Sequence, residues 1–355
     1  MTKTVQTAVV GVTGYAGAEL ARLLLHHPRL KGRPPVFAGR VDAKDLERGG
    51  VPLVEIHPQL ADNNGNGKLK MEPFSWELLV EFGVEVLFLA IPHELSRDWV
   101  PEALKRGMRV IDLSGAWRLA NEDNRAVYAF ADEGTELAAA TQAESVYGLP
   151  ELNRKQIAGA RLVANPGCYA TSIILPLKPL VGAGIVDLEH GIVADAKSGV
   201  SGAGKAPTAK THFMSAADNL SAYGVFTHRH TGELLEQIGV TASQIVFTPH
   251  LLPIPRGILS TIYVTFKKAQ THESVAQVYR EFFAASPMVR LYEKSLPQIQ
   301  YSVGTNYADI GFELDASARR AVIVSCLDNL LKGAAGQAVE NLNVMQGWPE
   351  SEGLA

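Results

Sequence analysis

A glycine-rich turn near the N-terminus constrains the fold of this chain more than any other feature. The segment GVTGYAG places Gly11, Gly14 and Gly17 between the apolar run of residues 7–12 and the helical pattern AELARLLL. Glycines at a strand-to-helix turn allow a tight bend and let a pyrophosphate approach the backbone at the helix N-terminus. The spacing is G-x-x-G-x-x-G rather than the usual G-x-G-x-x-G, but the same physics applies. We therefore expect a Rossmann-type dinucleotide-binding domain.

The pattern of expected strands and helices changes part-way along the chain. Apolar runs at 7–12, 35–38, 84–90 and 108–113 alternate with helical patterns at 19–25 and 99–106, which is typical of a parallel sheet. From about residue 191, β-branched runs such as QIVFTPHLL and LSTIYVTFKK predict an α+β domain with a mixed, mostly antiparallel sheet. We expect a dinucleotide-binding domain at 1–167, completed by a C-terminal helix at 329–355, and a catalytic domain at 168–328.

Composition excludes several classes of protein. The chain has 355 residues, of which 46% are hydrophobic, with 33 Lys+Arg against 37 Asp+Glu. The net charge of −4 gives no basic excess for nucleic acid or an anionic membrane. No apolar run approaches the ~20 residues of a membrane helix, and the N-terminus lacks the continuous apolar core of a secretion signal. We expect a cytoplasmic protein with no nucleic-acid or membrane partner.

The glycine-rich turn also carries information about the cofactor. Thr13 and Tyr15 lie within it and are candidate contacts beside the glycines. An NAD site usually has an acidic residue at the end of the second strand, to bind the ribose 2′-hydroxyl. Here Arg40 follows that strand, and its charge suits a 2′-phosphate. The sequence therefore favours NADP over NAD.

The stretch ANPGCYATSIILPL places a cysteine at the start of a predicted helix. Asn165, Pro166 and Gly167 form a turn, and Cys168 opens the apolar run that follows. Free amides and the positive end of the helix dipole in a first turn favour the thiolate, so we expect a lowered thiol pKa. Cys326, in contrast, lies in the apolar run AVIVSCL and is expected to be buried and inert.

A thiolate nucleophile needs a partner that transfers protons. The segment THRHTGE supplies His228 and His230 just before a predicted helix, and both side chains lie on one side if the segment is extended. The residues alone leave the choice between them open. No further ligands with convincing spacing accompany them, so we expect no metal.

Five residues are candidates for binding the substrate's anionic groups. Ser114 and Arg118 follow a predicted strand end, and Asn165 lies in the turn before the cysteine. Lys205 closes the loop KSGVSGAGK, and Arg256 lies in PIPRGIL. Arginine binds phosphate or carboxylate through two parallel N–H groups. The sequence does not decide which of these side chains meets phosphate and which meets carboxylate.

Taken together, the motifs resemble one family. GVTGYAGAEL, YGLPELNR, ANPGCYAT, KSGVSGAGK, HRHTGE, TPHLLPIPRGIL and DNLLKGAAGQAVENLN are similar to those of the N-acetyl-gamma-glutamyl-phosphate reductases, relatives of the aspartate-semialdehyde dehydrogenases. The resemblance extends from about residue 7 to about residue 346. One departure is SGAWR at 114–118, where the family commonly has a sequence like S-A-D-F-R.

The resemblance implies a function for the candidate residues. The family uses NADPH to reduce N-acetyl-L-glutamyl 5-phosphate to the 5-semialdehyde in arginine biosynthesis, releasing phosphate. Its catalytic cysteine, which forms a thioester, falls on Cys168, and its catalytic histidine falls on His230 or, as second choice, His228. The part of the family's cofactor site that holds the nicotinamide falls near Ser201, Gly202 and Asn329. The family's homo-oligomers, commonly dimers or tetramers, are expected here.

Three other functions remain open from the sequence. An aspartate-semialdehyde dehydrogenase would use the same cysteine and histidine on a shorter substrate. A relative in lysine biosynthesis would reduce aminoadipyl phosphate held by a carrier protein. A catalytically silent NADP-binding sensor would keep the fold, although the intact Cys168, His228 and His230 argue against it.

Overall fold

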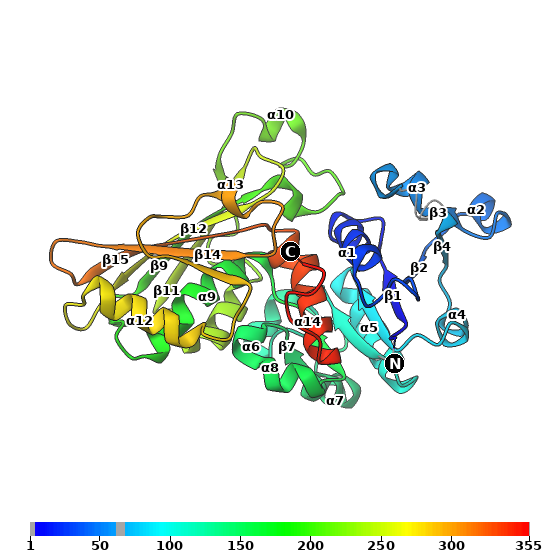
Figure 1. Cartoon of the computed structure of the whole chain (residues 1–355), viewed down its shortest axis with the longest axis horizontal. Helices are drawn as coiled ribbons and strands as arrows, with labels where there is room; N and C mark the ends of the chain where they lie inside the picture. The colour runs from blue at the N-terminus through cyan, green and yellow to red at the C-terminus, as the bar shows by residue number, and fades with distance from the viewer. Residues whose placement is uncertain (1–3, 62–67, 355) are drawn as a thin grey trace.

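Two β-sheets of different topology lie side by side in the computed structural model, which describes residues 4–61 and 68–354 (Figure 1). The first sheet comes from the N-terminal half of the chain and has eight strands. The second comes from the C-terminal half and has seven. The C-terminal helix, drawn in red, lies between them. This arrangement brings loops from both halves to one junction.

The first sheet has the strand order β3-β4-β2-β1-β5-β6-β8-β7 and is parallel except for β3. Its strands are β1 (Thr7–Val10), β2 (Val36–Gly39), β3 (Val51–Pro52), β4 (Lys70–Pro73), β5 (Val86–Leu89), β6 (Arg109–Asp112), β7 (Ser145–Tyr147) and β8 (Leu162–Ala164). The associated helices are α1 (Tyr15–His26), α2 (Ala43–Glu47), α3 (Leu53–Ile56), α4 (Trp76–Glu81), α5 (His93–Lys105), α6 (Glu122–Arg125), α7 (Glu136–Glu144) and α8 (Pro150–Gly159). Every residue of β1, β2 and β5 is buried, as expected where helices cover both faces of a sheet.

The glycine-rich turn connects β1 to α1, as the sequence predicts. Gly11 has a φ of +95°, and a β-carbon there would lie 2.1 Å from the carbonyl oxygen of Ala90. A β-carbon on Gly17 would lie 2.2 Å from the carbonyl oxygen of Gly11. The turn therefore packs backbone against backbone, which only glycine permits at these two positions.

The second sheet has the order β10-β11-β9-β12-β15-β14-β13. Four of its neighbouring pairs are antiparallel, and β9–β11 and β13–β14 are parallel. Its strands are β9 (Ile192–Gly199), β10 (Ser221–Ala222), β11 (Ile245–Leu252), β12 (Ile258–Thr265), β13 (Val289–Tyr292), β14 (Ala308–Leu314) and β15 (Arg320–Leu327). The helices of this half are α9 (Cys168–Gly182), α10 (Phe213–Ala216), α11 (Thr231–Leu234), α12 (His272–Phe282), α13 (Ile299–Ser302) and α14 (Gly336–Gln346). The expected α/β fold, with a parallel sheet and a mixed, mostly antiparallel one, is confirmed.

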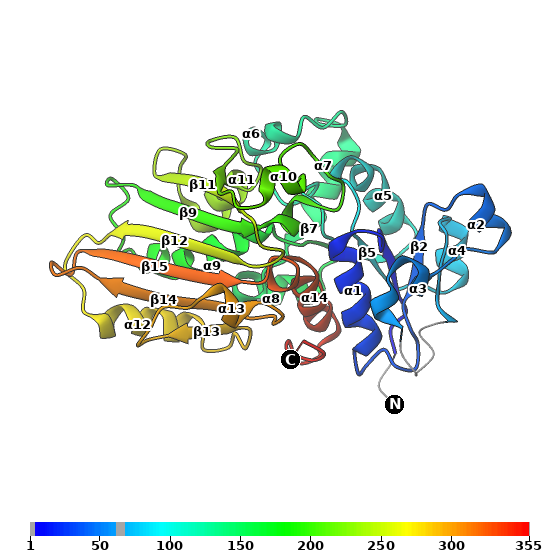
Figure 2. The same ribbon diagram turned by 90° about the horizontal axis from the view of Figure 1, so that it is seen from above.

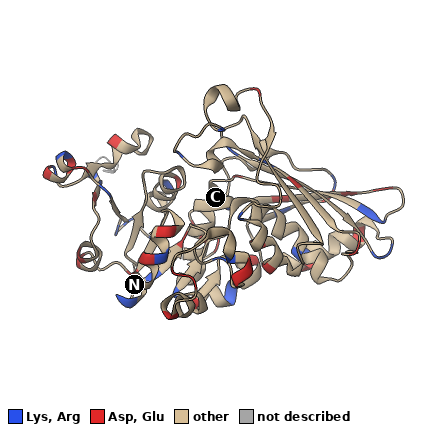
Figure 3. Ribbon diagram, turned by 180° about the vertical axis from the view of Figure 1, so that it is seen from behind, with Lys and Arg blue, Asp and Glu red and all other residues tan. Residues whose placement is uncertain are grey.

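Helices α9 and α12 cover only one face of the second sheet, and Figure 2 looks onto the other. The strands alternate accordingly: Ile258, Ser260 and Ile262 of β12 are buried, whereas Tyr263 is 46% exposed. Figure 3 shows that most of this sheet carries neither acidic nor basic residues. On the open face, Asp195 and Lys197 of β9 form an ion pair with each other beside exposed apolar side chains. An exposed apolar patch of this kind is typical of an interface.

Helix α14 packs against the first sheet rather than the second. Leu342 and Val339 share a hydrophobic cluster with Leu20 of α1 and Phe88 of β5. A π-helical turn, Leu331–Ala335, precedes α14 and approaches α9. The packing agrees with the expected return of the C-terminal helix to the first half, while the domain limits at 167 and 328 stay a prediction.

Candidate active site

A cavity of about 370 Å³ lies where the two sheets meet, at the carboxyl ends of the parallel strands. Twelve of the residues expected from the sequence line this first cavity: Gly14, Tyr15, Gly17, Ser114, Arg118, Asn165, Cys168, Ser201, Gly202, Lys205, His230 and Asn329. A second cavity, of about 230 Å³, adjoins it on the side of the second sheet. Cys168, Gly202, Arg229 and His230 line both cavities, and His228 lines only the second. The structure thus places Cys168 at the boundary of two cavities.

Cys168 is the first residue of α9, with Gly167 as its N-cap. Burial raises the pKa of its thiol to about 11, although the Tyr169 N–H and the charge of Arg118 act in the opposite direction. The expectation of a lowered thiol pKa is therefore wrong for this structure. The helix N-terminus does favour the thiolate, but the loss of water around the sulfur outweighs it. A base is needed to remove the proton.

His230 lines both cavities with Cys168 and is the candidate for that base. Its side chain is 16% exposed, and its Nε2 lies 4.0 Å from Oε1 of Glu233. Burial lowers its pKa well below 6.5, helped by His228, Arg118 and Arg229. Its Nδ1 is buried and has no hydrogen-bond partner within the described part of the chain. A neutral imidazole with a free ring nitrogen is able to accept a proton at pH 7.

His228 has a different environment. Its Nδ1 accepts a hydrogen bond from the backbone N–H of His230, at 3.1 Å. Its ring packs edge-on against those of Tyr169, Tyr223 and Phe247. Burial and the charge of Arg229 lower its pKa to about 4. Because Nδ1 is an acceptor, the neutral ring carries its proton on Nε2 and is an N–H donor.

Arg118 is held rigidly at the first cavity. Its Nε donates to the carbonyl of Asn165 at 2.7 Å and its Nη2 to that of Leu113 at 2.9 Å. Its Nη1 donates to Oε1 of Glu233 at 3.2 Å. These bonds use three of five N–H donors and leave two for an anion.

The structure also reveals a residue that the sequence reasoning missed. Glu233 is completely buried beside the N-terminus of α9. Its Oε2 accepts from the Gly167 N–H at 2.9 Å and from the Tyr147 hydroxyl at 2.7 Å. The sequence signal was present in HRHTGE, but the glutamate reads there as an ordinary residue of a helix start.

Two expected substrate residues already have protein partners. The Ser114 hydroxyl donates to the buried Asp112 at 2.7 Å and accepts from the Ala116 N–H at 3.1 Å. The Asn165 amide donates to the carbonyl of Ala334 at 3.0 Å and accepts from Asn341. Both line the first cavity, but these bonds mainly fix its wall.

Lys205 and Arg256 both line a further cavity, but they have different protein partners. Lys205 donates to the carbonyl of Thr13 at 3.2 Å and so joins the loop after β9 to the glycine-rich turn. Arg256 pairs with Glu19 of α1 at 2.8 Å and with Asp328. It lines a separate cavity that does not include Cys168. The structure therefore does not bring Arg256 into the cavities that Cys168 lines, because it is paired with carboxylates from both halves of the chain.

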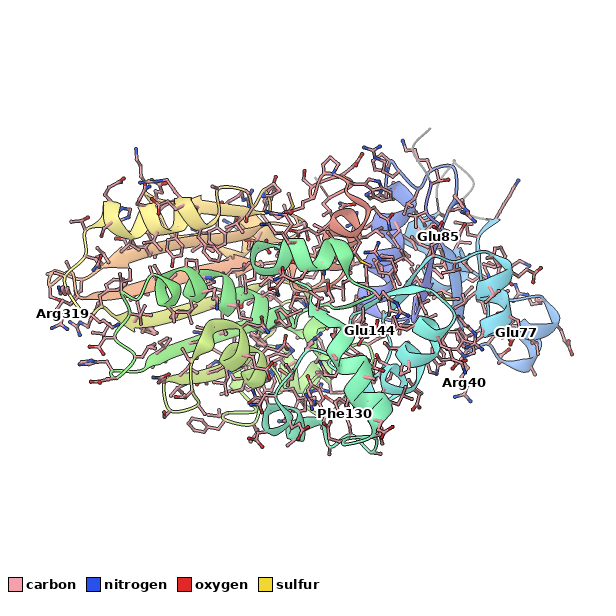
Figure 4. All side chains as sticks on the ribbon, turned by 90° about the horizontal axis from the view of Figure 1, so that it is seen from below. Arg40, Glu77, Glu85, Phe130, Glu144 and Arg319 are labelled. Carbon is pink, nitrogen blue, oxygen red and sulfur yellow. The ribbon has the colours of Figure 1, made fainter. Side chains whose placement is uncertain are left out.

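The expected cofactor residues divide into three groups. Asn329 donates to the Ser201 hydroxyl at 2.9 Å and accepts from the Gly257 N–H at 2.7 Å, so these side chains form one wall of the first cavity. The first turn of α1 has no side-chain cap, which leaves its amides for a phosphate. Thr13, Gly11 and Arg40 do not line this cavity; Arg40 follows β2 and points outward at the periphery (Figure 4).

Similar proteins fit this geometry. Residues 6–160 match the semialdehyde dehydrogenase NAD binding domain, and residues 168–329 match the semialdehyde dehydrogenase dimerisation domain. The N-acetyl-gamma-glutamyl-phosphate reductase of Desulfotalea psychrophila is 42% identical over 357 residues, covering 99% of this chain and 98% of that protein. The chain belongs to the N-acetyl-gamma-glutamyl-phosphate reductase family. A reductase of the same name from Akkermansia muciniphila is also 42% identical, covering 99% of each protein.

Solved structures show the same fold at low identity. Aspartate semialdehyde dehydrogenase II from Vibrio cholerae, complexed with ASA, has a TM-score of 0.69 at 19% identity, covering 97% of this chain and 98% of that one. Aspartate semialdehyde dehydrogenase with NADP from Candida albicans has a TM-score of 0.69 at 16% identity, covering 98% and 99%. The expected family, fold class and oxidoreductase class are confirmed, and the expected activity is the one for which the N-acetyl-gamma-glutamyl-phosphate reductases are named.

Several expectations are resolved only in part. The NAD binding domain supports a nicotinamide dinucleotide, while the choice of NADP stays a prediction. The dimerisation domain supports a homo-oligomer. No helix within residues 4–61 and 68–354 has the length and apolar character to span a membrane. The same residues contain no group of three or more His, Cys, Asp or Glu side chains suited to a metal ion.

Proposed function

We propose that the protein reduces N-acetyl-L-glutamyl 5-phosphate with NADPH, releasing N-acetyl-L-glutamate 5-semialdehyde and phosphate, in the cytoplasm. The observation that carries this proposal is the position of Cys168, which borders two cavities next to a neutral His230. One cavity adjoins the dinucleotide turn and the other has room for an acyl chain. The reducing and acylating parts of the reaction therefore meet at one sulfur.

The first cavity fits a nicotinamide dinucleotide. Gly11 and Gly17 leave no room for a β-carbon at the turn, and the free amides of α1 suit a pyrophosphate. Ser201, Gly202 and Asn329 line the route from that turn to Cys168 and would flank the nicotinamide. The bound cofactor supplies the hydride. Arg40, at the end of β2, would contact a 2′-phosphate, which favours NADPH.

The thiol reacts first. His230 accepts the proton of Cys168, and the sulfur attacks the acyl carbonyl and expels phosphate, leaving a thioester. Reduction of that thioester carbon, by the hydride that a bound cofactor would supply, would leave a thiohemiacetal oxyanion on Cys168. His230 then returns its proton as the C–S bond breaks and the aldehyde leaves. We infer that the N–H of Tyr169, which favours the Cys168 thiolate at the start of α9, would also stabilise the negative oxygen in both additions.

The substrate's charged groups have distinct partners in this proposal. The two remaining N–H donors of Arg118 are available to the leaving phosphate in the first cavity. Lys210 and Arg229 line the second cavity and would hold the carboxylate of the acyl chain. His228 offers an Nε2–H donor to the same chain. Arg256 is not needed for either group, since its charge is already paired.

We also propose that two copies pair through the open face of the second sheet. Tyr263, Val193 and Val246 lie side by side there and are 46%, 43% and 37% exposed. Covering them removes an apolar surface from water. Tyr263→Glu should convert the oligomer to a monomer in light scattering, and an unchanged mass would refute this interface.

The catalytic proposal is tested by Cys168→Ala with Cys326→Ala as control. We expect Cys168→Ala to abolish NADPH oxidation with the acyl phosphate while NADPH affinity stays within about twofold. Cys326 is a free, buried thiol on β15 and does not line either cavity, so its variant should stay active. Loss of NADPH binding in Cys168→Ala, or residual turnover, would contradict the assignment.

A further inference from the structure

Glu233 is a buried carboxylate for which the steps above have no use. It lies on α11, three residues after His230, and none of its side chain is exposed. An ionised carboxylate is costly to bury unless it is paired and hydrogen-bonded. Glu233 is fully satisfied, by the Gly167 N–H, the Tyr147 hydroxyl and the Arg118 guanidinium. Such complete compensation indicates a constructed site rather than an accident of packing.

The partners of Glu233 come from separate parts of the chain. Tyr147 ends β7, Arg118 follows β6, and Gly167 is the N-cap of α9, immediately before Cys168. Arg118 and Glu233 are 115 residues apart in the sequence. One carboxylate therefore fixes both the start of the cysteine helix and the arginine of the first cavity.

The same carboxylate faces the proposed base. Its Oε1 lies 4.0 Å from Nε2 of His230, whereas Nδ1 of that ring has no partner in the described residues. When the thiol proton moves to the ring, the S–H bond breaks, an N–H bond forms, and the ring becomes a cation. A carboxylate at this distance is too far to form a hydrogen bond with the ring, but its charge stabilises that cation.

We propose that Glu233 is a positioning residue that completes a Cys168–His230–Glu233 arrangement and stabilises the protonated His230 formed during thiol attack. This inference rests on the proposed function of Cys168 and His230. It assigns to Glu233 no contact with substrate or cofactor. Its effects pass through His230, Gly167 and Arg118.

Loss of the Glu233 charge should have opposite effects on the acidity of the Cys168 thiol and on turnover. The charge of Glu233 opposes ionisation of the Cys168 thiol, while Arg118 favours it. Other titratable groups also line the two cavities. They are Tyr15, His93, Tyr128, Tyr169, Lys205, Lys210, Tyr223, His228, Arg229 and His230. Glu233→Gln removes one negative charge and leaves all of these in place. The thiol should become more acidic while turnover becomes slower.

The experiment compares Glu233→Gln with Glu236→Gln. Glu236 is a matched control because it lies one turn further on and accepts hydrogen bonds from Ala120, Asn121 and Asn124, away from Cys168. For Glu233→Gln we expect alkylation of Cys168 by iodoacetamide at pH 8 to be about three- to tenfold faster, since more thiolate is present. We expect kcat to fall at least about tenfold. Glu236→Gln should change neither rate by more than about twofold.

Other outcomes overturn the proposal. Unchanged kcat and unchanged alkylation in Glu233→Gln would show that the carboxylate has no such role, and slower alkylation together with slower turnover would show only a disturbed fold. If Glu233→Gln does not fold, Tyr147→Phe removes one hydrogen bond and keeps the charge. It should lower kcat about threefold or more without faster alkylation, and full activity would refute the positioning role. An active Cys168→Ala would instead refute the proposed function itself.

Discussion

The imidazole of His230 lies against the α-carbon of Gly167, the residue just before Cys168. A β-carbon on Gly167 would lie 2.4 Å from Nε2 of His230 and 2.6 Å from two of its ring carbons. The backbone at Gly167, with φ −72° and ψ 146°, is one that any residue adopts. Glycine is therefore required here for space rather than for conformation, because it lets the ring approach the start of the cysteine helix.

Gly167→Ala should consequently impair catalysis without unfolding the protein. The new methyl group must displace the His230 ring, and a misplacement of about 1 Å in a catalytic group lowers turnover about 100-fold. Steady-state kinetics give kcat, and thermal unfolding checks stability. Gly159→Ala, at the end of α8, is the control because a β-carbon there meets nothing within 4 Å. Normal kcat in Gly167→Ala would mean that His230 is not the base.

The pH dependence of Cys168 alkylation follows from its raised pKa. Burial raises that pKa to about 11, so the thiol is protonated below this value and the thiolate fraction grows with pH. Alkylation of the free protein by iodoacetamide should rise about tenfold per pH unit between pH 7 and 10. Mass spectrometry of samples quenched at successive times measures the rate of alkylation. A plateau beginning near pH 7 would show that the resting site already holds a thiolate.

On the acid side, kcat/KM should fall only well below pH 6.5. Burial lowers the pKa of His230 well below this value, so the ring stays neutral and able to accept a proton until more acidic pH. The pH profile of kcat/KM measures this limb. An acid limb centred at or above pH 6.5 would contradict the environment described for His230.

Arg40→Ala should discriminate between the two nicotinamide cofactors. Arg40 is exposed at the end of β2, where a 2′-phosphate would lie. We expect KM for NADPH to rise about tenfold or more through the loss of a charge-assisted contact, with KM for NADH nearly unchanged. Lys44→Ala on neighbouring α2 controls for a general loss of positive charge. Equal changes in KM for NADPH and NADH would show that Arg40 does not contact a 2′-phosphate.

A second buried network predicts how stability varies with pH. Lys332 is fully buried between Glu151 and Glu340, at 2.6 and 2.7 Å. Burial raises the pKa of Glu340 to about 8 despite Lys332. A carboxyl whose pKa is raised on folding adds stability at low pH, and this stability is lost as pH rises through that value.

The free energy of unfolding should therefore decline between about pH 5 and 9, and Glu340→Gln should make this decline smaller. Urea unfolding at several pH values measures it. Glu281→Gln is the control, because Glu281 is an exposed residue of α12. Parallel pH curves for the wild type and Glu340→Gln would refute this role of Glu340.

The parts of the fold that depend on local sequence were predictable. The turn at Gly11–Gly17 and the helix start at Cys168 follow from glycine, proline and apolar spacing within a few residues. Both lie where the sequence indicated. The alternation of strands and helices likewise predicted the parallel sheet.

The electrostatics of the site were not predictable, because they depend on contacts between distant segments. The thiol pKa follows from burial between both halves of the chain, and Arg256 pairs with Glu19 across 237 residues. Glu233 and Lys332 look like ordinary charges on helices, since no local pattern shows that they are buried. The sequence therefore predicted the wrong direction for the thiol pKa of Cys168 and gave no sign of Glu233, because both depend on burial by distant segments.

The most direct test of the account is the reverse reaction. The protein is incubated with N-acetyl-L-glutamate 5-semialdehyde and NADP, and formation of NADPH is followed with and without inorganic phosphate. We expect NADPH formation that requires phosphate and that is absent in Cys168→Ala. No NADPH with phosphate present, combined with activity on carrier-bound aminoadipate semialdehyde, would contradict the proposed substrate. NADPH formation that is independent of phosphate would contradict the release of phosphate through a Cys168 thioester.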